Sequence, residues 1–221
     1  MVAGSDPVVV NPSEKHTATL IFFHGLGDQG HGWSDVAKSE LKLKYLKGIF
    51  PNAANRKVTL NFGMNMPAWY DLYGLSPDVQ EDDAGIANAT KYVHDLIDAE
   101  IKAGIPAKRI VLGGFSMGGA LALYAGLTYK EPLGAIVGLS SFLLQRNKLP
   151  GDYKANLQTP IFLGHGTNDF LVPFTFGQLT AEAIKQFNPN VELHSYPMEH
   201  SSCPQELRDF KAFLEKHIPQ Q

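Results

Sequence analysis

The glycine-rich run GGFSMGG at residues 113–119 most constrains how this chain folds. An apolar stretch at 109–112 precedes it and a helical stretch at 120–128 follows it. Residues 114–118 match G-x-S-x-G, a strand-to-helix turn so tight that side chains at the glycine positions would collide with neighbouring elements. This pattern predicts that Ser116 stands exposed at the carboxyl end of a strand. A turn that binds phosphate or only packs is the alternative, but the run lacks the lysine of a phosphate-binding P-loop.

Apolar segments bounded by glycine and proline alternate along the chain with segments of helical periodicity. Strands are expected at 17–23, 58–62, 109–112, 133–139, 160–163 and 191–196, and helices at 33–47, 82–103, 120–128, 174–187 and 204–217. Such alternation predicts an α/β fold with a mostly parallel central sheet covered by helices on both faces. We expect one domain over residues 1–221, with an edge strand as an open alternative within the N-terminal segment 1–16. The stretch 63–81 is the longest candidate loop.

A nucleophilic serine requires a base, and in this kind of fold the chain order is Ser, then Asp or Glu, then His. His200 follows the last predicted strand, in a loop at the sheet edge where Ser116 is expected. The other histidines fit this order less well. His165 precedes any suitable acid, while His194 and His217 lie inside predicted elements. His200 is therefore the candidate base.

Asp169 is the candidate acid, because it lies in the loop after the strand at 160–163. Taken alone, it is more simply a turn residue or a helix cap. Asp152 and Glu182 are placed less well, one in a surface loop and one inside a helix. Three residues of the right types, in the right order and at three strand ends, together favour a Ser116–Asp169–His200 triad.

Composition excludes several other classes of protein. The net charge is −3 and the lysines and arginines are scattered, apart from Lys42, Lys44 and Lys47, which we expect on one solvated helix face. No nucleic-acid partner is therefore expected. No signal peptide and no apolar run of about 18 residues is present, so stable membrane insertion is not expected. The single cysteine, Cys203, fits a reducing, cytoplasmic location. Histidine and cysteine spacing indicates no metal, and no cofactor is expected.

Five segments together resemble the acyl-protein thioesterase (lysophospholipase/carboxylesterase) family of α/β-hydrolases. They are HGLGD at 24–28, GGFSMGG at 113–119, the loop at 164–173, HSSC at 200–203, and MPAWYDLYGLSP at 66–77. The resemblance implies removal of long-chain acyl groups from protein cysteines, with activity on lysophospholipids and small esters. Ser116, Asp169 and His200 match the triad of the family. Leu26 matches the residue whose backbone N–H completes an oxyanion hole with that of Met117.

The chain departs from the family pattern at two positions near the expected site. Met117 stands where glutamine is often found, and Phe142 stands where many members have tryptophan. Because the oxyanion donor is a backbone group, the first change should alter the pocket rather than the chemistry. His24 is expected to brace the oxyanion loop and not to transfer a proton.

Apolar residues near the predicted strand ends could form the acyl-binding surface, although any single one is more simply a core residue. The candidates are Met66, Leu72, Leu75, Phe142, Leu171 and Phe174. S-acylated proteins or lysophospholipids are the expected substrates, with transient contact at a membrane surface. The chain is expected to be a monomer or a weak homodimer. Three alternatives remain, namely a lysophospholipase, a small-ester carboxylesterase, and a non-catalytic binding module on a hydrolase fold.

Overall fold

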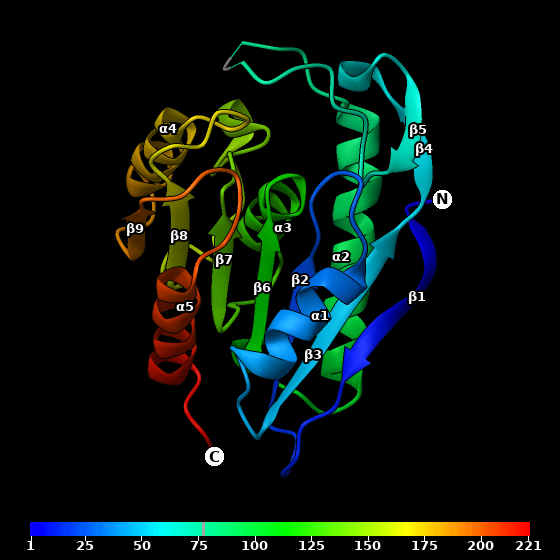
Figure 1. Cartoon of the computed structure of the whole chain (residues 1–221). Helices are drawn as coiled ribbons and strands as arrows, with labels where there is room; N and C mark the ends of the chain where they lie inside the picture. Colours follow the sequence, from blue (N-terminus) through cyan, green and yellow to red (C-terminus); the bar gives the residue numbers. More distant parts are fainter. Residues whose placement is uncertain (77) are drawn as a thin grey trace.

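A central sheet positions all other elements. The computed structural model describes residues 1–76 and 78–221, and the main sheet within them has seven strands in the order β1-β3-β2-β6-β7-β8-β9 (Figure 1). β1 pairs antiparallel with β3, whereas every other neighbouring pair is parallel. The predicted mostly parallel sheet is therefore confirmed. Its strands are β1 (Ala3–Val10), β2 (Ala18–Phe23), β3 (Leu46–Ala53), β6 (Ile110–Phe115), β7 (Ala135–Leu139), β8 (Ile161–Gly166) and β9 (Val191–Tyr196).

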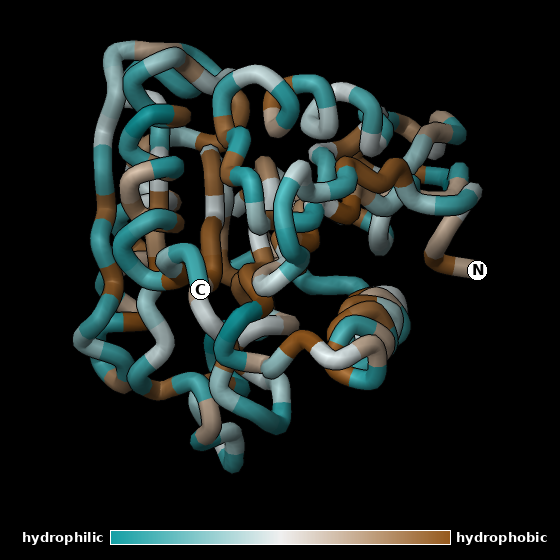
Figure 2. Tube along the Cα trace, turned by 90° about the horizontal axis from the view of Figure 1, so that it is seen from below, coloured by the Kyte–Doolittle hydropathy of each residue, from teal (hydrophilic) through white to brown (hydrophobic). Residues whose placement is uncertain are grey.

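Helices cover both faces of this sheet, because the strands are apolar on both sides. On one face, α1 (Gly30–Ser39) and α5 (Pro204–His217) pack over side chains such as Phe22. On the other, α2 (Asp83–Lys102), α3 (Met117–Leu127) and α4 (Phe174–Lys185) pack over side chains such as Ile21. The hydrophobic segments accordingly run through the middle of the molecule in Figure 2.

Strand β3 was not predicted from the sequence, because LKGIFPNA contains a glycine, a proline and an asparagine that disfavour strands. The structure accommodates Pro51 with an irregularity in β1. The pairing skips from Ser5↔Asn52 to Val8↔Phe50, so two residues of β1 face the single proline. The Asn52 side chain fills part of the gap by donating a hydrogen bond of 2.8 Å to the Asp6 carbonyl oxygen.

Three further predictions between residues 33 and 81 were wrong in part. The helix expected over 33–47 ends at Ser39, although Leu41 and Leu43 beyond it are still buried in the core. In place of a strand at 58–62 there is β4 (Asn55–Val58), followed by a 3₁₀ turn at Thr59–Asn61. β4 forms a hairpin with β5 (Met64–Pro67), which lies inside the stretch predicted as loop. Pro77, at the end of the 66–77 motif, lies outside the described residues.

The lysines at positions 42, 44 and 47 do not share a helix face. Lys44 forms an ion pair with Glu14, and Lys47 on β3 pairs with the buried Glu100 at 2.7 Å.

Helix α2 lies within one residue of its predicted bounds, and the Asp82 side chain caps it by accepting a hydrogen bond from the Gly85 N–H. None of the helices in the described part of the chain combines the length and apolar composition that a membrane crossing requires.

Candidate active site

Ser116 lies in the tight turn between β6 and α3. Its φ of 53° and ψ of −120° form a backbone conformation that residues other than glycine rarely adopt. A Cβ atom at Gly114 would overlap the Gly118 backbone, and one at Gly118 would overlap the carbonyl oxygens of Phe23 and His24. The two glycines therefore permit the strained turn that G-x-S-x-G predicts, and the turn presents Ser116 at the carboxyl end of β6.

A chain of hydrogen bonds joins Ser116 to two residues from other strand ends. His200, in the loop after β9, has its Nε2 atom 3.0 Å from Ser116 Oγ. Its Nδ1 atom lies 2.7 Å from Asp169 Oδ2, in the loop after β8. The structure thus brings together three residues that lie far apart in the sequence. A hydroxyl paired with an imidazole whose other nitrogen faces a carboxylate can be activated as a nucleophile.

The carboxylate of Asp169 is almost fully buried and well supplied with donors. The backbone N–H groups of Leu171 and Val172 donate to Oδ1 at 3.0 and 2.8 Å, while His200 donates to Oδ2. The ring of Phe115 packs against that of His200 at 4.8 Å between centroids. Both contacts fix the orientation of the imidazole between acid and serine.

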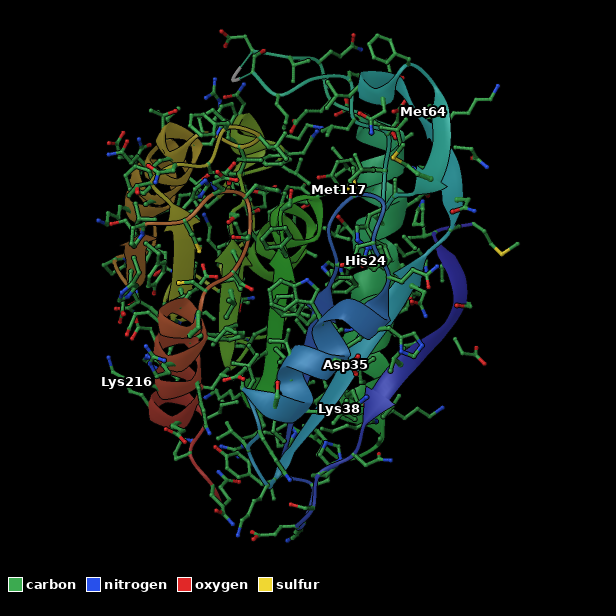
Figure 3. All side chains as sticks on the ribbon, viewed as in Figure 1. His24, Asp35, Lys38, Met64, Met117 and Lys216 are labelled. Atoms are coloured by element: carbon green, nitrogen blue, oxygen red, sulfur yellow. The ribbon has the colours of Figure 1, made fainter. Side chains whose placement is uncertain are left out.

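The HGLGD loop after β2 lies beside the serine. A Cβ atom at Gly25 would be 3.5 Å from Ser116 Cβ. Within residues 1–76 and 78–221, the N–H groups of Leu26 and Met117 donate to no other protein atom. Met117 starts α3, and His24 directly follows the last residue of β2 (Figure 3). Two free donors on loops that flank a nucleophile can bind an oxyanion.

His24 braces this loop from inside the core, where it is fully buried. Its Nδ1–H donates to the Gly25 carbonyl oxygen at 2.7 Å, and its Nε2 accepts from the Ala53 N–H at 3.1 Å. This pattern requires a neutral ring, in agreement with burial, which lowers the pKa of His24. The indole of Trp69 also donates to the His24 carbonyl oxygen at 2.9 Å. These contacts agree with the bracing role that the sequence predicts for His24.

A cavity of about 890 Å³ lies close to the turn that carries Ser116, but Ser116, His200 and Asp169 are not among the residues that line it. Its walls come from the loop after β5, the segment after β7 and one face of α4. Two contacts tie it to the site. Ser141, the neighbour of the lining residue Phe142, donates to the Ser116 carbonyl oxygen at 2.9 Å. The hydroxyl of Tyr70, another lining residue, donates to the Met117 carbonyl oxygen at 3.4 Å.

Only three of the six predicted acyl-binding residues line this cavity, namely Leu72, Leu75 and Phe142. Met66 lies on β5, where its sulfur faces the Asn61 amide at 3.2 Å. Leu171 projects outward with 64% of its surface exposed. Phe174 starts α4 and packs edge-on against His165. The cavity face of α4 is formed instead by Phe176, Leu179, Thr180 and Ala183.

Two residues that the sequence did not indicate, Glu81 and Gln145, hold two walls of the cavity together. Glu81 accepts hydrogen bonds from the backbone and side-chain amides of Gln145 at 3.0–3.2 Å. Partial burial raises the pKa of Glu81. No local sequence pattern could indicate this contact, because Glu81 and Gln145 are 64 residues apart in the chain. No group of three or more metal-ligating side chains occurs among the residues that the structure describes.

Comparison with known proteins agrees with this geometry. The phospholipase/carboxylesterase family model matches residues 5–218. An acyl-protein thioesterase 1 of Neurospora crassa is 42% identical over 99% of this chain and 94% of its own length. One from Schizosaccharomyces pombe is 46% identical over 83% of each chain. The crystal structure of Zea mays acyl-protein thioesterase 2 superposes with a TM-score of 0.86 at 32% identity, covering 97% of this chain and 99% of that one. The chain therefore belongs to the phospholipase/carboxylesterase family of α/β-hydrolases.

Proposed function

We propose that the protein is a serine hydrolase that removes long-chain acyl groups, such as palmitoyl, from protein cysteines. The observation that carries the proposal is the hydrogen-bonded chain Ser116–His200–Asp169. A cavity of about 890 Å³, whose lining residue Phe142 follows the Ser116 contact Ser141, supports it. Relatives that carry the name acyl-protein thioesterase, at 42% and 46% identity, support it.

In the proposed mechanism, Ser116 Oγ attacks the acyl carbonyl carbon while His200 Nε2 takes the hydroxyl proton. Asp169 stabilises the imidazolium and keeps the ring in the required tautomer. His200 then returns the proton to the departing thiolate, which leaves the acyl group on Ser116. A water molecule, whose proton His200 takes, then attacks the acyl carbon. His200 returns that proton to Ser116 Oγ as the bond to the serine breaks and the fatty acid leaves.

The oxyanion formed in each step lies where the N–H groups of Leu26 and Met117 can reach it. Removing one such donor in another serine hydrolase costs about 2.7–4 kcal/mol in the transition state. Because both donors belong to the backbone, replacement of the usual glutamine by Met117 leaves the chemistry intact. The side chain of Met117 is itself buried in the core of the protein.

The size of the cavity favours substrates with a long acyl chain over substrates with a short one. Its volume lies in the upper part of the range of about 300–1,000 Å³ that is typical of ligand pockets. Each methylene group buried from water contributes about 0.8 kcal/mol. An acyl chain bound in this cavity would contact Phe142, Leu72 and Leu75, together with the α4 face. Substrates with a long chain, including lysophospholipids, are therefore favoured over acetyl esters.

The setting of the enzyme is also part of the proposal. We place it in the cytoplasm, as one α/β-hydrolase domain over residues 1–221 that is a monomer or a weak homodimer. A single cysteine, which cannot form an internal disulfide, supports this location. S-acylated proteins are the proposed partners, reached by transient contact with membrane surfaces. Exposed apolar side chains such as Phe62 and Phe170, at 97% and 83% exposure, support such contact.

The test is hydrolysis of matched palmitoyl and acetyl thioesters by the wild type and by Ser116→Ala. Rapid palmitoyl turnover that disappears in the variant would support the proposal. Turnover confined to acetyl substrates would move the assignment to a small-ester carboxylesterase, and faster turnover of lysophospholipids than of acylated peptides would move it to a lysophospholipase. Activity that survives in Ser116→Ala would reject the triad. Absence of labelling by a fluorophosphonate would instead indicate a binding module.

A further inference from the structure

His165 is a buried histidine that the proposed mechanism does not use. It lies near the carboxyl end of β8, four residues before Asp169, and is only 1% exposed. Its ring is close to the acid of the triad, since His165 Nε2 lies 3.7 Å from Asp169 Oδ2. That distance is too long for a hydrogen bond. Any hydrogen-bonded connection between the ring and the acid must therefore run through other atoms.

The connection runs through the backbone of Val172. His165 Nε2–H donates to the Val172 carbonyl oxygen at 2.7 Å. The N–H of the same residue donates to Asp169 Oδ1 at 2.8 Å, and Asp169 Oδ2 faces His200 at 2.7 Å. Val172 is thus held on both sides, by the imidazole at its carbonyl and by the carboxylate at its N–H.

The protonation state of His165 agrees with this arrangement. A carbonyl oxygen only accepts hydrogen bonds, so the Nε2 atom must carry a proton. Burial lowers the pKa of His165, and the titratable groups that face the ring are Asp169 and His200. The ring is therefore neutral at physiological pH, with the proton on Nε2 and none on Nδ1.

The other side of the ring packs against α4. A Cβ atom at Gly177 would lie 2.7 Å from His165 Nδ1, and the Phe174 ring meets the imidazole edge-on at 5.9 Å between centroids. The cavity face of the same helix carries Phe176 and Leu179. One buried ring thus contacts both the loop that holds the catalytic acid and the helix that forms a wall of the acyl cavity.

We propose that His165 is a positioning residue that holds the Asp169 loop and ties it to the α4 wall of the cavity. This inference rests on the proposed function, because it assumes that Asp169 and His200 act as acid and base. Without the Nε2 donor, the Val172 carbonyl loses its partner and the Asp169 carboxylate is held less firmly. The carboxylate then stabilises positive charge on the base less well, so kcat falls and the acidic limb of the kcat/KM profile moves to lower pH.

The test compares His165→Gln, His165→Asn and His165→Leu. The glutamine amide nitrogen reaches the position of Nε2, whereas that of asparagine reaches only the position of Nδ1. Active sites are counted with a fluorophosphonate, and kcat, KM and the pH profile are then measured per active site with palmitoyl and acetyl thioesters. Replacing His194, which stacks on Phe162 and is hydrogen-bonded to Glu192, by glutamine and by leucine provides the matched control.

We expect His165→Asn and His165→Leu to lower kcat per active site about 10- to 100-fold, with the larger loss on the palmitoyl substrate, and to shift the pH profile. His165→Gln should recover most of kcat, and the His194 variants should resemble the wild type. A lower melting temperature with unchanged kcat and pH profile would overturn the proposal, as would equal losses in the Gln and Asn variants. Equal losses on both substrates would overturn the link to α4. A wild type that fluorophosphonate does not label would reject the proposed function itself.

Discussion

The reacting groups and the acyl cavity are neighbours, but different forces hold them. Backbone contacts fix Ser116 and Asp169, through glycines that admit no side chain and through amide donors to a buried carboxylate. The cavity walls are joined by side chains from distant loops, such as Glu81 and Gln145. The chemistry is therefore built into rigid strand ends, whereas the shape of the cavity depends on contacts that single substitutions can change. The following predictions test this division.

The largest loss of activity is expected among the reacting groups on the rigid strand ends, in the variant Asp169→Asn. The amide cannot hold His200 in the tautomer that accepts the serine proton, so kcat/KM should fall about 10⁴-fold. The loss should be similar for palmitoyl and acetyl substrates, because the cavity is untouched. The control is Asp152→Asn, in a surface turn. A loss confined to one chain length would contradict the separation of chemistry from shape.

How much the sequence predicts follows the same division. The triad lies on short segments at strand ends, so its residue types, order and turn chemistry could all be inferred locally. The cavity wall, by contrast, is formed by segments that are far apart in the sequence and meet only in the folded protein. Leu171 and Phe174 are apolar residues near a predicted strand end, but the loop turns the first outward and helical geometry places the second on the other side of α4 from the cavity. Strand β3 could not be predicted locally, because Gly48 and Pro51 disfavour a strand. Only the pairing of β3 with β1 and β2 in the folded protein compensates for this low strand propensity.

Glu206 packs against the rigid strand β8, but within the described part of the chain its carboxyl group is not stabilised by hydrogen bonds as that of Asp169 is. The next largest effect, on the stability of the fold, is expected there. It lies in the first turn of α5, fully buried against Gly164, and neither carboxylate oxygen has a partner among the described residues. Burial raises its pKa from 4.5 to about 8. The folded state therefore favours the protonated form, so the associated stability is present below pH 4.5 and is lost as pH rises through 8.

Glu206→Gln should remove this dependence. The free energy of unfolding of the wild type should fall relative to that of the variant between pH 5 and 9, by an amount on the order of a few kcal/mol, since a tenfold change in proton affinity is worth about 1.4 kcal/mol. Urea unfolding at several pH values measures it. Asp209→Asn, on the same helix, is the control. Parallel curves for wild type and Glu206→Gln would show that this carboxyl does not titrate in that range.

A smaller and more selective effect is expected at the cavity wall. Ala183→Phe places a ring in the cavity from α4, so the ratio of palmitoyl to acetyl kcat/KM should fall about 10- to 100-fold, equivalent to about 1.4–2.7 kcal/mol. Gln178→Phe adds the same ring to an exposed position of the helix outside the cavity lining and should leave the ratio unchanged. If both variants lose acetyl activity equally, the wall and the reacting groups are not separable.

The smallest effect is expected at the exposed rim of the cavity, where two lining residues, Arg146 and Asp78, form an ion pair of 3.5 Å. Their side chains are 42% and 95% exposed, so water and salt screen the attraction, and pairs of this kind contribute about 0–1 kcal/mol. Arg146→Gln should change KM for a palmitoyl thioester less than about twofold, at low and high salt alike. Glu81→Gln alters a half-buried carboxylate with two amide donors from Gln145, and should raise KM more than the rim variant does. If Arg146→Gln instead has the larger effect and loses it in high salt, the cavity is held closed by exposed charge and not by the buried hydrogen bonds beneath it.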